Sequence, residues 1–569
     1  MTFTPHPQTA VSQSPERVNA GAYIVQFLES MGVDRVYGVP GESYLPVLEA
    51  LRLSGIETLT TRHESSAGFM ALVDGRLTGR PGVVMVSRGP GATNASIAIH
   101  TAQQDGIPMM VLIGQVERRH LRRDGFQEID YGQMFGSIAK WVAEVTDPDD
   151  LPRILSRAYS TAISSTPGPV VIALPEDMLE LDVSDHAVLS SGHRATVSGP
   201  LSAPLTAPDP VSAQRLLEML HQASRPLIVA GMEFSQPGAR QTLLAFAEAF
   251  NIPVAVSFRR HDLFPNQHRL YAGDMSSSNT AEQRALFESS DLVIALGTRL
   301  GDLSTHGYTF PRSPTPRQPL IHVYNDAAMV GRHYNPTIGL ACKAPDLLAL
   351  LLNMASPSSP GLTAQRDTWA SQLHQAMLKR GTLPARQFDD GVYYAKLVST
   401  ISRLADQAVS VVPDAGISAA QVYRYFTFTG QRRLYATMAG VMGFGVPGSI
   451  ALAMREHDRR VVCLVGDGGF MMTGFELAVA VERGLNICFF LANNRNLGTI
   501  TMHQEKHYPG GAHGTTLSGP DFTQLALAFG CPTLKLDQDG DMDRVVAEAL
   551  AMTGPVLVDV RTSLQAIKP

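Results

Sequence analysis

Two polar clusters near the C-terminal end of the sequence each follow a short apolar run. Gly466-Asp467-Gly468-Gly469 comes directly after the run 461–465, and Asn493-Asn494-Arg495-Asn496 follows the run 487–491. Continuous apolar runs of this length are typical of buried parallel strands. Because the carboxyl ends of parallel strands meet at the ligand-binding edge of a sheet, we expect the two clusters to lie close together.

The residue types in these clusters suit a metal ion and a diphosphate. The Asp467 carboxylate and the Asn494 amide are hard oxygen donors of the kind that Mg²⁺ or Ca²⁺ takes, and Mg²⁺ is usually shared with phosphates. Gly468 and Gly469 let a phosphate approach the backbone at the positive end of the following helix. Each half alone could be an ordinary Asp-Gly or Asn-Asn turn, but the two halves together favour a site.

The spacing of the two clusters carries a family resemblance. Gly-Asp-Gly, 24 residues and then Asn-Asn resembles the cofactor motif of the thiamine-diphosphate enzymes, a family that includes acetolactate synthase, pyruvate decarboxylase and pyruvate oxidase. The resemblance implies that Asp467, Asn494 and the main-chain carbonyl of Asn496 hold Mg²⁺ against the diphosphate. Gly466, Gly468 and Gly469 would then line the same site.

Strand-like runs alternate with helical patterns along most of the 569 residues, which predicts an α/β fold with parallel sheets. Stretches rich in Ser and Pro interrupt this alternation twice. We expect three doubly wound parallel-sheet domains, named here after the resembling family. The expected domains are a pyrimidine-binding domain at 17–181, a central domain at 213–354 and a diphosphate-binding domain at 389–569. A tail at 1–16 precedes them, and linkers at 182–212 and 355–388 separate them.

Glu64 follows a strand-like run in the sequence Arg62-His63-Glu64 and precedes a helical pattern. On its own it could be a first-turn glutamate that the helix dipole favours. The resemblance instead implies that Glu64 binds N1′ of the cofactor's aminopyrimidine and promotes its imino tautomer. Asn94, in the turn 89–94, would lie near the same ring, or it caps the following helix.

The glycine-rich stretch 438–447 contains one bulky residue, Met442, which periodicity alone would assign to the core. The resemblance, closest here to acetolactate synthase, implies that Met442 wedges between the two cofactor rings. The Gly440 carbonyl and the Met442 N–H would hold the pyrimidine. Gly416 and Ser418 stand where acetolactate synthase has a Gly-Gln-His segment against the diphosphate, and Ser418 would substitute for the missing side chains.

Substrate residues follow from the same resemblance. Phe126 and Gln127 lie in a segment similar to the GQVxRR…FQE segment of acetolactate synthase, where both residues face the active site. Arg299, in Gly-Thr-Arg, would hold an acceptor carboxylate, although a surface arginine is the plainer alternative. Thr499 and His503 replace a methionine and a tryptophan of the synthase, and His503 is a candidate proton donor.

These residues predict decarboxylation of a 2-keto acid such as pyruvate with carboligation to a second carbonyl compound. The alternatives are a decarboxylase that releases an aldehyde, or a cofactor-binding protein without turnover. The resemblance allows FAD, but the glycines that contact it are largely absent near residue 231, so FAD is not expected. It also implies a homodimer or homotetramer with the cofactor between subunits.

Composition limits the other partners. The formal net charge is −6 and there is no basic stripe, so nucleic acid is not an expected partner. There is no apolar run of membrane-spanning length and no signal-peptide pattern. The four cysteines form no CxxC pairs, so their spacing suggests neither a disulfide framework nor a zinc site. The expected location is the cytoplasm.

Overall fold

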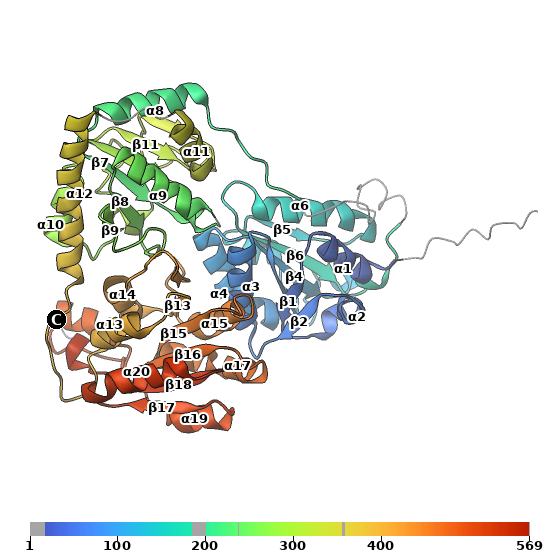
Figure 1. The fold of residues 1–569 in the computed structure, drawn as a ribbon. Helices are drawn as coiled ribbons and strands as arrows, with labels where there is room; N and C mark the ends of the chain where they lie inside the picture. Colours follow the sequence, from blue (N-terminus) through green and yellow to red (C-terminus); the bar gives the residue numbers. More distant parts are fainter. Residues whose placement is uncertain (1–17, 185–200, 237, 355–358, 568–569) are drawn as a thin grey trace, which may run out of the picture.

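Figure 1 shows three units, each built around a sheet, that follow one another along the sequence. The structure is a computed structural model that describes residues 18–184, 201–236, 238–354 and 359–567. The predicted tail at 1–16 lies outside these residues, as does much of the first predicted linker. We call the parts around the three sheets the N-terminal, central and C-terminal units.

Each unit is built on a six-stranded sheet whose strands all pair in parallel. The strand orders are β2-β1-β3-β4-β6-β5, β12-β11-β10-β7-β8-β9 and β14-β13-β15-β16-β18-β17. The N-terminal strands are β1 (Arg35–Gly38), β2 (Glu57–Thr60), β3 (Gly82–Val86), β4 (Met109–Gln115), β5 (Trp141–Glu144) and β6 (Pro169–Pro175). The central strands are β7 (Pro226–Ala230), β8 (Val254–Ser257), β9 (Tyr271–Met275), β10 (Leu292–Leu296), β11 (Leu320–Val323) and β12 (Ile338–Leu340). The C-terminal strands are β13 (Val409–Pro413), β14 (Arg433–Leu434), β15 (Arg460–Gly466), β16 (Ile487–Asn493), β17 (Thr533–Leu536) and β18 (Val556–Arg561).

Helices connect the strands and cover the sheets (Figure 1). The N-terminal unit has α1 (Ala20–Ser30), α2 (Leu45–Leu53), α3 (Glu64–Thr78), α4 (Pro90–Asp105), α5 (Tyr131–Phe135) and α6 (Leu151–Ile163). The central unit has α8 (Pro210–Gln222), α9 (Ala239–Phe250), α10 (Ala281–Glu288), α11 (Ala344–Met354) and α12 (Pro360–Gly381). The C-terminal unit has α13 (Tyr394–Leu404), α14 (Gly416–Tyr425), α15 (Gly445–Ala453), α16 (Asp467–Thr473), α17 (Leu477–Glu482), α18 (Gly498–His507), α19 (Phe522–Ala528) and α20 (Met542–Ala551). The predicted α/β class with three parallel sheets is therefore confirmed.

The second predicted linker contains a long helix. α12 spans 22 residues inside the range 355–388, and its side chains are tied to the central unit. The Trp369 indole donates to the Pro226 carbonyl at 2.9 Å, and the buried Arg366 guanidinium donates to carbonyls at the ends of α8 and α9. Composition did not reveal this helix, because Ser and Pro residues surround it and polar residues dominate the segment.

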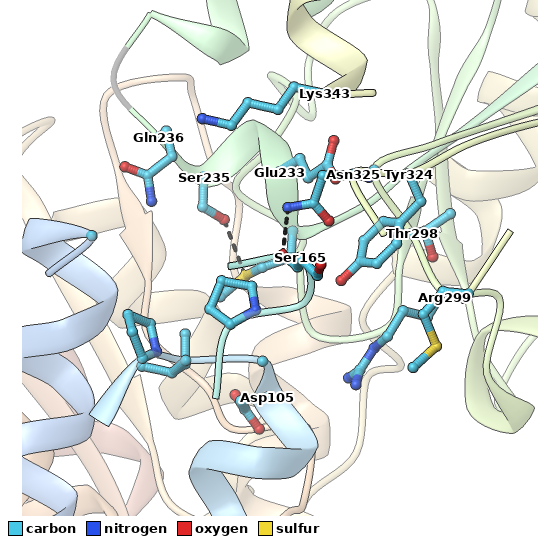
Figure 2. Close-up of a pocket in the computed structure, with 18 of the residues that line it drawn as sticks. Asp105, Ser165, Glu233, Ser235, Gln236, Thr298, Arg299, Tyr324, Asn325 and Lys343 are labelled. Atoms are coloured by element: carbon cyan, nitrogen blue, oxygen red, sulfur yellow. Dashed lines mark hydrogen bonds between the residues drawn. The ribbon is translucent and has the colours of Figure 1, made fainter. Parts of the chain in front are cut away.

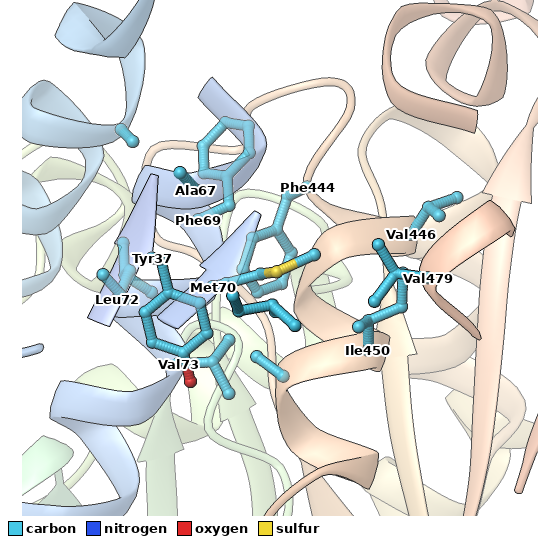
Figure 3. Packing of buried hydrophobic residues seen from close by; sticks show 14 of the residues in the cluster. Tyr37, Ala67, Phe69, Met70, Leu72, Val73, Phe444, Val446, Ile450 and Val479 are labelled. Atoms are coloured by element: carbon cyan, nitrogen blue, oxygen red, sulfur yellow. The ribbon is translucent and has the colours of Figure 1, made fainter. Parts of the chain in front are cut away.

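The N-terminal and C-terminal units share one apolar core within the chain (Figure 3). α3 packs against α15, and the rings of Phe69 and Phe444 meet edge to face with centroids 5.8 Å apart. Arg76 on α3 also donates to the Leu434 carbonyl at 2.9 Å. This contact fixes α3, which begins at Glu64, relative to the sheet that carries Asp467.

None of the helices in the described ranges is long and apolar enough to cross a membrane.

Candidate functional site

The two polar clusters predicted from the sequence lie side by side at the carboxyl ends of β15 and β16. The strands pair in register from Val461 with Ile487 to Gly466 with Ala492, so the residues that follow them share one edge of the sheet. Arg495 has a φ of 52°, and this left-handed residue bends the chain between Asn494 and Asn496. The Asn496 N–H donates to Asn494 Oδ1 at 3.0 Å and orients that amide.

Asp467 presents a buried oxygen with no partner. Its side chain is 5% exposed, and Oδ1 accepts a hydrogen bond from the Gly468 N–H at 2.8 Å. Oδ2 is buried and has no hydrogen-bond partner in the part of the chain that the structure describes. Burial raises the pKa of Asp467, although surrounding backbone N–H groups oppose this. A buried, unsatisfied carboxylate oxygen beside an amide oxygen is a fitting ligand set for a hard divalent cation.

Asn493 and Asn494 have different surroundings although they are adjacent. The Asn493 amide donates to Asp559 Oδ1 at 3.0 Å, which ties it to the neighbouring strand β18. Asn494 instead lines a cavity together with Asp467 and Asn496. Only the second asparagine of the pair is therefore placed to act as a ligand.

The loop that carries Gly440 and Met442 is held against the first turn of α16, where Asp467 lies. A buried carboxylate that the sequence reasoning missed, Asp414 at the end of β13, accepts a hydrogen bond from the Gly443 N–H at 3.1 Å. Burial raises the pKa of Asp414 to about 7. A Cβ at Gly469 would lie only 2.2 Å from Asp414 Oδ2, so this position requires glycine. Asp414 follows a buried strand as Asp467 does, and that pattern could have identified it.

The Met442 side chain remains 37% exposed and reaches over the glycines of the cluster. A Cβ at Gly468 would lie 3.4 Å from Met442 Cε, so the methionine approaches the first turn of α16. Periodicity alone suggested a core residue, but a core methionine would be fully buried. Its position above an open cavity fits the predicted wedge, which stays a prediction.

These residues enclose a cavity of about 280 Å³. Gly416, which has a φ of 78°, and Ser418 line it at the N-terminus of α14. The Ser418 hydroxyl donates to the Ala415 carbonyl at 3.2 Å. All described lining residues lie between Tyr393 and Ile567, in the C-terminal unit, and they include Gly440, Met442, Gly466, Asp467, Gly468, Gly469, Asn494 and Asn496.

Glu64 and Asn94 form a second polar group on the N-terminal unit. Glu64 starts α3, and the Asn94 amide donates to Glu64 Oε2 at 2.9 Å. Asn94 does not cap α4, because the helix already begins at Pro90 after Gly89. Gly89 has a φ of 54°, and a Cβ there would lie 2.6 Å from the Gln127 carbonyl oxygen. The predicted substrate segment therefore lies against the turn that leads to Asn94.

Phe126 and Gln127 project from this segment without burial. Phe126 is 75% exposed, and Gln127 is exposed with a φ of 64°. Their role toward substrate stays a prediction.

A residue that the sequence reasoning missed positions the loop before Glu64. The Glu476 carboxylate accepts hydrogen bonds from the N–H groups of Arg62 at 2.8 Å and His63 at 3.2 Å. Glu476 is 1% exposed, and burial raises its pKa. It follows α16, so a short segment connects Asp467 to the backbone that presents Glu64. A glutamate inside the apolar helical run after Phe470 was the available signal.

The Glu64 group and the Asp467 group do not meet within one chain. Glu64 is absent from the cavity that Asp467 lines, and no hydrogen bond between described residues joins the two groups. The sequence reasoning assigned both groups to one small cofactor. A single chain thus presents two separate halves of the predicted site.

Arg299 lies in another, larger cavity, of about 1510 Å³, between the N-terminal and central units (Figure 2). Its guanidinium donates to the Gln104 carbonyl, and Thr298, Tyr324 and Asn325 lie around it. Arg299 does not line the cavity that holds Asp467. The structure therefore does not bring Arg299 together with Asp467 in one chain, and its contact with an acceptor stays a prediction.

The larger cavity contains a half-buried carboxylate at the edge of the central sheet. Glu233 accepts hydrogen bonds at 2.8 Å from the N–H groups of Asn325 and of Ala344, the first residue of α11. Burial raises the pKa of Glu233 to about 7. In parallel sheets a dinucleotide diphosphate binds at such a crevice and helix N-terminus. Here the chain's own carboxylate takes those donors, so this crevice does not fit a diphosphate.

Thr499 and His503 lie on α18, which follows the loop of Asn494 and Asn496. The Thr499 hydroxyl accepts a hydrogen bond from the Ile417 N–H at 2.8 Å and lines the smaller cavity. His503 is exposed and is not among the lining residues of that cavity. The role of His503 as a proton donor stays a prediction.

Family models and curated relatives match almost the whole chain. The thiamine pyrophosphate enzyme models match residues 18–134 (N-terminal TPP binding domain), 213–351 (central domain) and 414–560 (C-terminal TPP binding domain). The acetolactate synthase isozyme 1 large subunit of Escherichia coli strain K12 is 30% identical over 97% of this chain and 95% of its own length. The isozyme 3 large subunit of the same strain is 30% identical over 94% and 92%, and the acetolactate synthase large subunit of Corynebacterium glutamicum is 30% identical over 98% and 89%. The chain therefore belongs to the thiamine-pyrophosphate enzymes, and within them it is an acetolactate-synthase-like enzyme.

Proposed function

We propose that this enzyme decarboxylates a 2-keto acid such as pyruvate and joins the remaining acyl unit to a second carbonyl compound, with Mg²⁺ and thiamine diphosphate. The observation that carries the proposal is the buried Asp467 Oδ2, which has no hydrogen-bond partner among the described residues and lies beside Asn494 in a cavity floored by glycines. Thiamine diphosphate, when bound, stabilises the negative charge that remains after CO₂ leaves.

Different residues of the chain would hold the metal ion, the diphosphate and the aminopyrimidine. Asp467, Asn494 and the Asn496 carbonyl would hold Mg²⁺, and the backbone around Gly468, Gly469 and Gly416 would accept the diphosphate. The Gly440 carbonyl and the Met442 N–H would orient the aminopyrimidine. Glu64 would hold a proton at N1′ of that ring, and Asn94 fixes the Glu64 carboxyl through the 2.9 Å hydrogen bond.

The working unit that we propose is a homodimer, alone or paired into a tetramer, in which the Glu64 group of one chain faces the Asp467 group of the other. Its support is the separation of the two groups within one chain. Several large apolar side chains also remain exposed near the two groups, and a partner chain would bury them. They are Phe126, Met442, Met471, Met472 and Phe475.

Carboligation is favoured over aldehyde release because three relatives that match nearly the full chain are acetolactate synthases by name. FAD is not part of the proposal. Glu233 occupies the backbone donors at the central sheet edge that a dinucleotide diphosphate would need.

The test is a product assay with pyruvate, thiamine diphosphate and Mg²⁺. Accumulation of acetolactate supports the proposal, and acetaldehyde as the main product would replace carboligation with simple decarboxylation. The control is Glu64→Gln, which should bind the cofactor but form neither product at a comparable rate. Binding of cofactor by the wild-type chain without turnover of any 2-keto acid would contradict both enzymatic readings.

A further inference from the structure

The turn 437–440 separates the two cavities. Met438 and Ala439 line the larger cavity, whereas Gly440 lines the smaller one. The Gly440 N–H donates to the Thr437 carbonyl at 3.3 Å, and Gly440 has a φ of 64°, so this residue ends a tight turn. The backbone of the turn therefore sets the direction of the Gly440 carbonyl.

A buried aspartate of the N-terminal unit holds this turn. Asp105 is the last residue of α4, and its Oδ1 accepts a hydrogen bond from the Met438 N–H at 2.7 Å. Asp105 is buried and lines the larger cavity. A carboxylate binds a backbone N–H more strongly than a neutral acceptor does. Asp105 thus fixes the middle of the turn from outside the C-terminal unit.

A buried arginine of the central unit holds the aspartate in turn. Arg260 Nη2 lies 3.6 Å from Asp105 Oδ2, and Arg260 Nη1 donates to the Ala436 carbonyl at 3.0 Å, directly before the turn. Arg76 on α3 also donates to the Ala436 carbonyl, at 3.3 Å. Side chains of the N-terminal and central units therefore hold both the start and the middle of the segment that leads to Gly440.

The two ends of α4 contact the two halves of the predicted site. Near the start of the helix Asn94 donates to Glu64 Oε2, and at its end Asp105 accepts from the turn before Gly440. Asn94 and Asp105 are 11 residues apart, so about 16 Å separates them along the helix. In the proposed dimer the two ends belong to different cofactor sites, because Glu64 and Asp467 of one chain serve different cofactors.

We propose that Asp105 is a positioning residue for the cofactor pyrimidine. By holding the Met438 N–H, it sets the direction of the Gly440 carbonyl and the Met442 N–H, which would orient the aminopyrimidine. Asp105 acts through the turn, because it lines the larger cavity while Gly440 and Met442 line the smaller one. This inference rests on the proposed function.

Two substitutions separate positioning from stability. Asp105→Asn and Asp105→Ala both leave the buried Arg260 without its charged partner, so both should lower the midpoint of thermal unfolding. Only asparagine keeps an acceptor oxygen for the Met438 N–H, which is the closer donor, at 2.7 Å against 3.6 Å for Arg260. Exchange of the C2 proton of bound thiamine diphosphate should therefore slow by about 10- to 100-fold in Asp105→Ala and by less than about threefold in Asp105→Asn.

Ligand titrations locate the loss. Thiamine diphosphate with Mg²⁺ should bind about tenfold more weakly to Asp105→Ala than to wild type, whereas pyrophosphate with Mg²⁺, which lacks the pyrimidine, should bind both within about threefold. The matched control is Asp326→Ala, because Asp326 accepts a hydrogen bond from the Thr166 N–H at 3.1 Å and so joins two units away from the turn. This control should exchange the C2 proton as wild type does. If Asp105→Ala does not fold, the double variant with Arg260→Met takes its place, since it buries no unpaired charge.

Mixed dimers assign Asp105 to one of the two sites. Asp105→Ala mixed with Glu64→Gln should regain acetolactate formation, because one site then combines an intact Glu64 with an intact turn. Asp105→Ala mixed with Asp467→Ala should stay low. Recovery with Asp467→Ala instead would place Asp105 with the Glu64 half of the site and would overturn the inference.

A wild-type exchange rate in Asp105→Ala would also overturn it. Equal slowing in Asp105→Asn and Asp105→Ala would do the same, because a purely structural role depends on the charge and not on the acceptor oxygen. Weaker binding of pyrophosphate to Asp105→Ala would count against a role confined to the pyrimidine. If wild type exchanges the C2 proton but forms no acetolactate, the proposed function fails, and slower exchange in Asp105→Ala alone would still support Asp105 as the positioning residue.

Discussion

The side-chain amide of Asn94 donates a hydrogen bond to Glu64 Oε2 at 2.9 Å, and this pair forms the polar centre of the N-terminal half-site. The bond joins the first turn of α3 to α4, so it fixes the direction of the glutamate carboxyl. The other carboxyl oxygen lies near Gly91, where a Cβ would be 3.4 Å away. Glu64 is thus held on one side and left open on the other.

Glu64→Gln should keep the fold and most of the affinity for thiamine diphosphate, because the amide is nearly isosteric. Exchange of the C2 proton of bound cofactor for deuterium should slow by roughly 10²- to 10⁴-fold, since the group that holds a proton at N1′ is lost. Asn94→Ala should give a smaller loss, because it removes only the orienting hydrogen bond. An exchange rate in Glu64→Gln equal to that of wild type would remove Glu64 from this role.

Asp467→Asn should abolish Mg²⁺-dependent binding of thiamine diphosphate while leaving the volume of the site unchanged. The amide lacks the charge that compensates the cation, and it removes the unpartnered carboxylate oxygen beside Asn494. The measurement is a cofactor titration at several Mg²⁺ concentrations, with Asn493→Ala as the control for the neighbouring asparagine that contacts Asp559. Cofactor affinity in Asp467→Asn that still rises with Mg²⁺ as in wild type would refute the metal site.

The stability of the protein should depend on pH through Glu233. Its pKa of about 7 in the folded chain lies above the value of about 4.3 expected when unfolded. Between these values the folded protein holds a proton that the unfolded chain releases. The free energy of unfolding should therefore fall as pH rises from about 4.5 to 7, by about 3 kcal/mol in total, and Glu233 should add no further change above that range.

Glu233→Gln should remove this slope, since the amide does not titrate. Urea unfolding of both proteins at pH 5, 6, 7 and 8 measures it, with the exposed Glu218→Gln as the control. The same fall in unfolding midpoint in wild type and Glu233→Gln would show that other groups cause the pH dependence.

Phe444→Ala should destabilise the protein by about 3–5 kcal/mol, because the ring fills the core shared by α3 and α15. Phe444→Leu should cost less, since it keeps most of the buried apolar volume. Chemical unfolding measures both variants. A loss below about 1 kcal/mol for the alanine variant would mean that the two units do not depend on this contact.

Much of the fold was readable because buried parallel strands have continuous apolar sequences. The runs around Val461 to Val465 and Ile487 to Leu491 correspond to β15 and β16, and the polar residues after them share one sheet edge. Edge strands are harder to recognise in the sequence, since β5 is only half-buried and β14 has two residues.

The contacts of the site that could not be predicted join residues far apart in the sequence. Glu476 binds the backbone of Arg62, which lies far away in the sequence, and no local pattern reveals such a pair. Arg299 lines the cavity between the N-terminal and central units, and its contact with an acceptor, which a short motif suggested, stays a prediction. Motif spacing predicted that Asp467 and Asn494 lie together, and the structure places both in one cavity.

The most direct test of the account mixes two inactive chains, Glu64→Gln and Asp467→Ala, under conditions in which subunits exchange. Each mixed dimer would have one intact site, formed by the Glu64 of one chain and the Asp467 of the other, and one doubly damaged site. The account predicts that acetolactate formation from pyruvate returns to about a quarter of the wild-type level, since random mixing makes half of the dimers mixed. Exchange that is demonstrated by mass spectrometry without any recovery of acetolactate formation would contradict it, because both halves of the site would then have to serve one cofactor within a single chain.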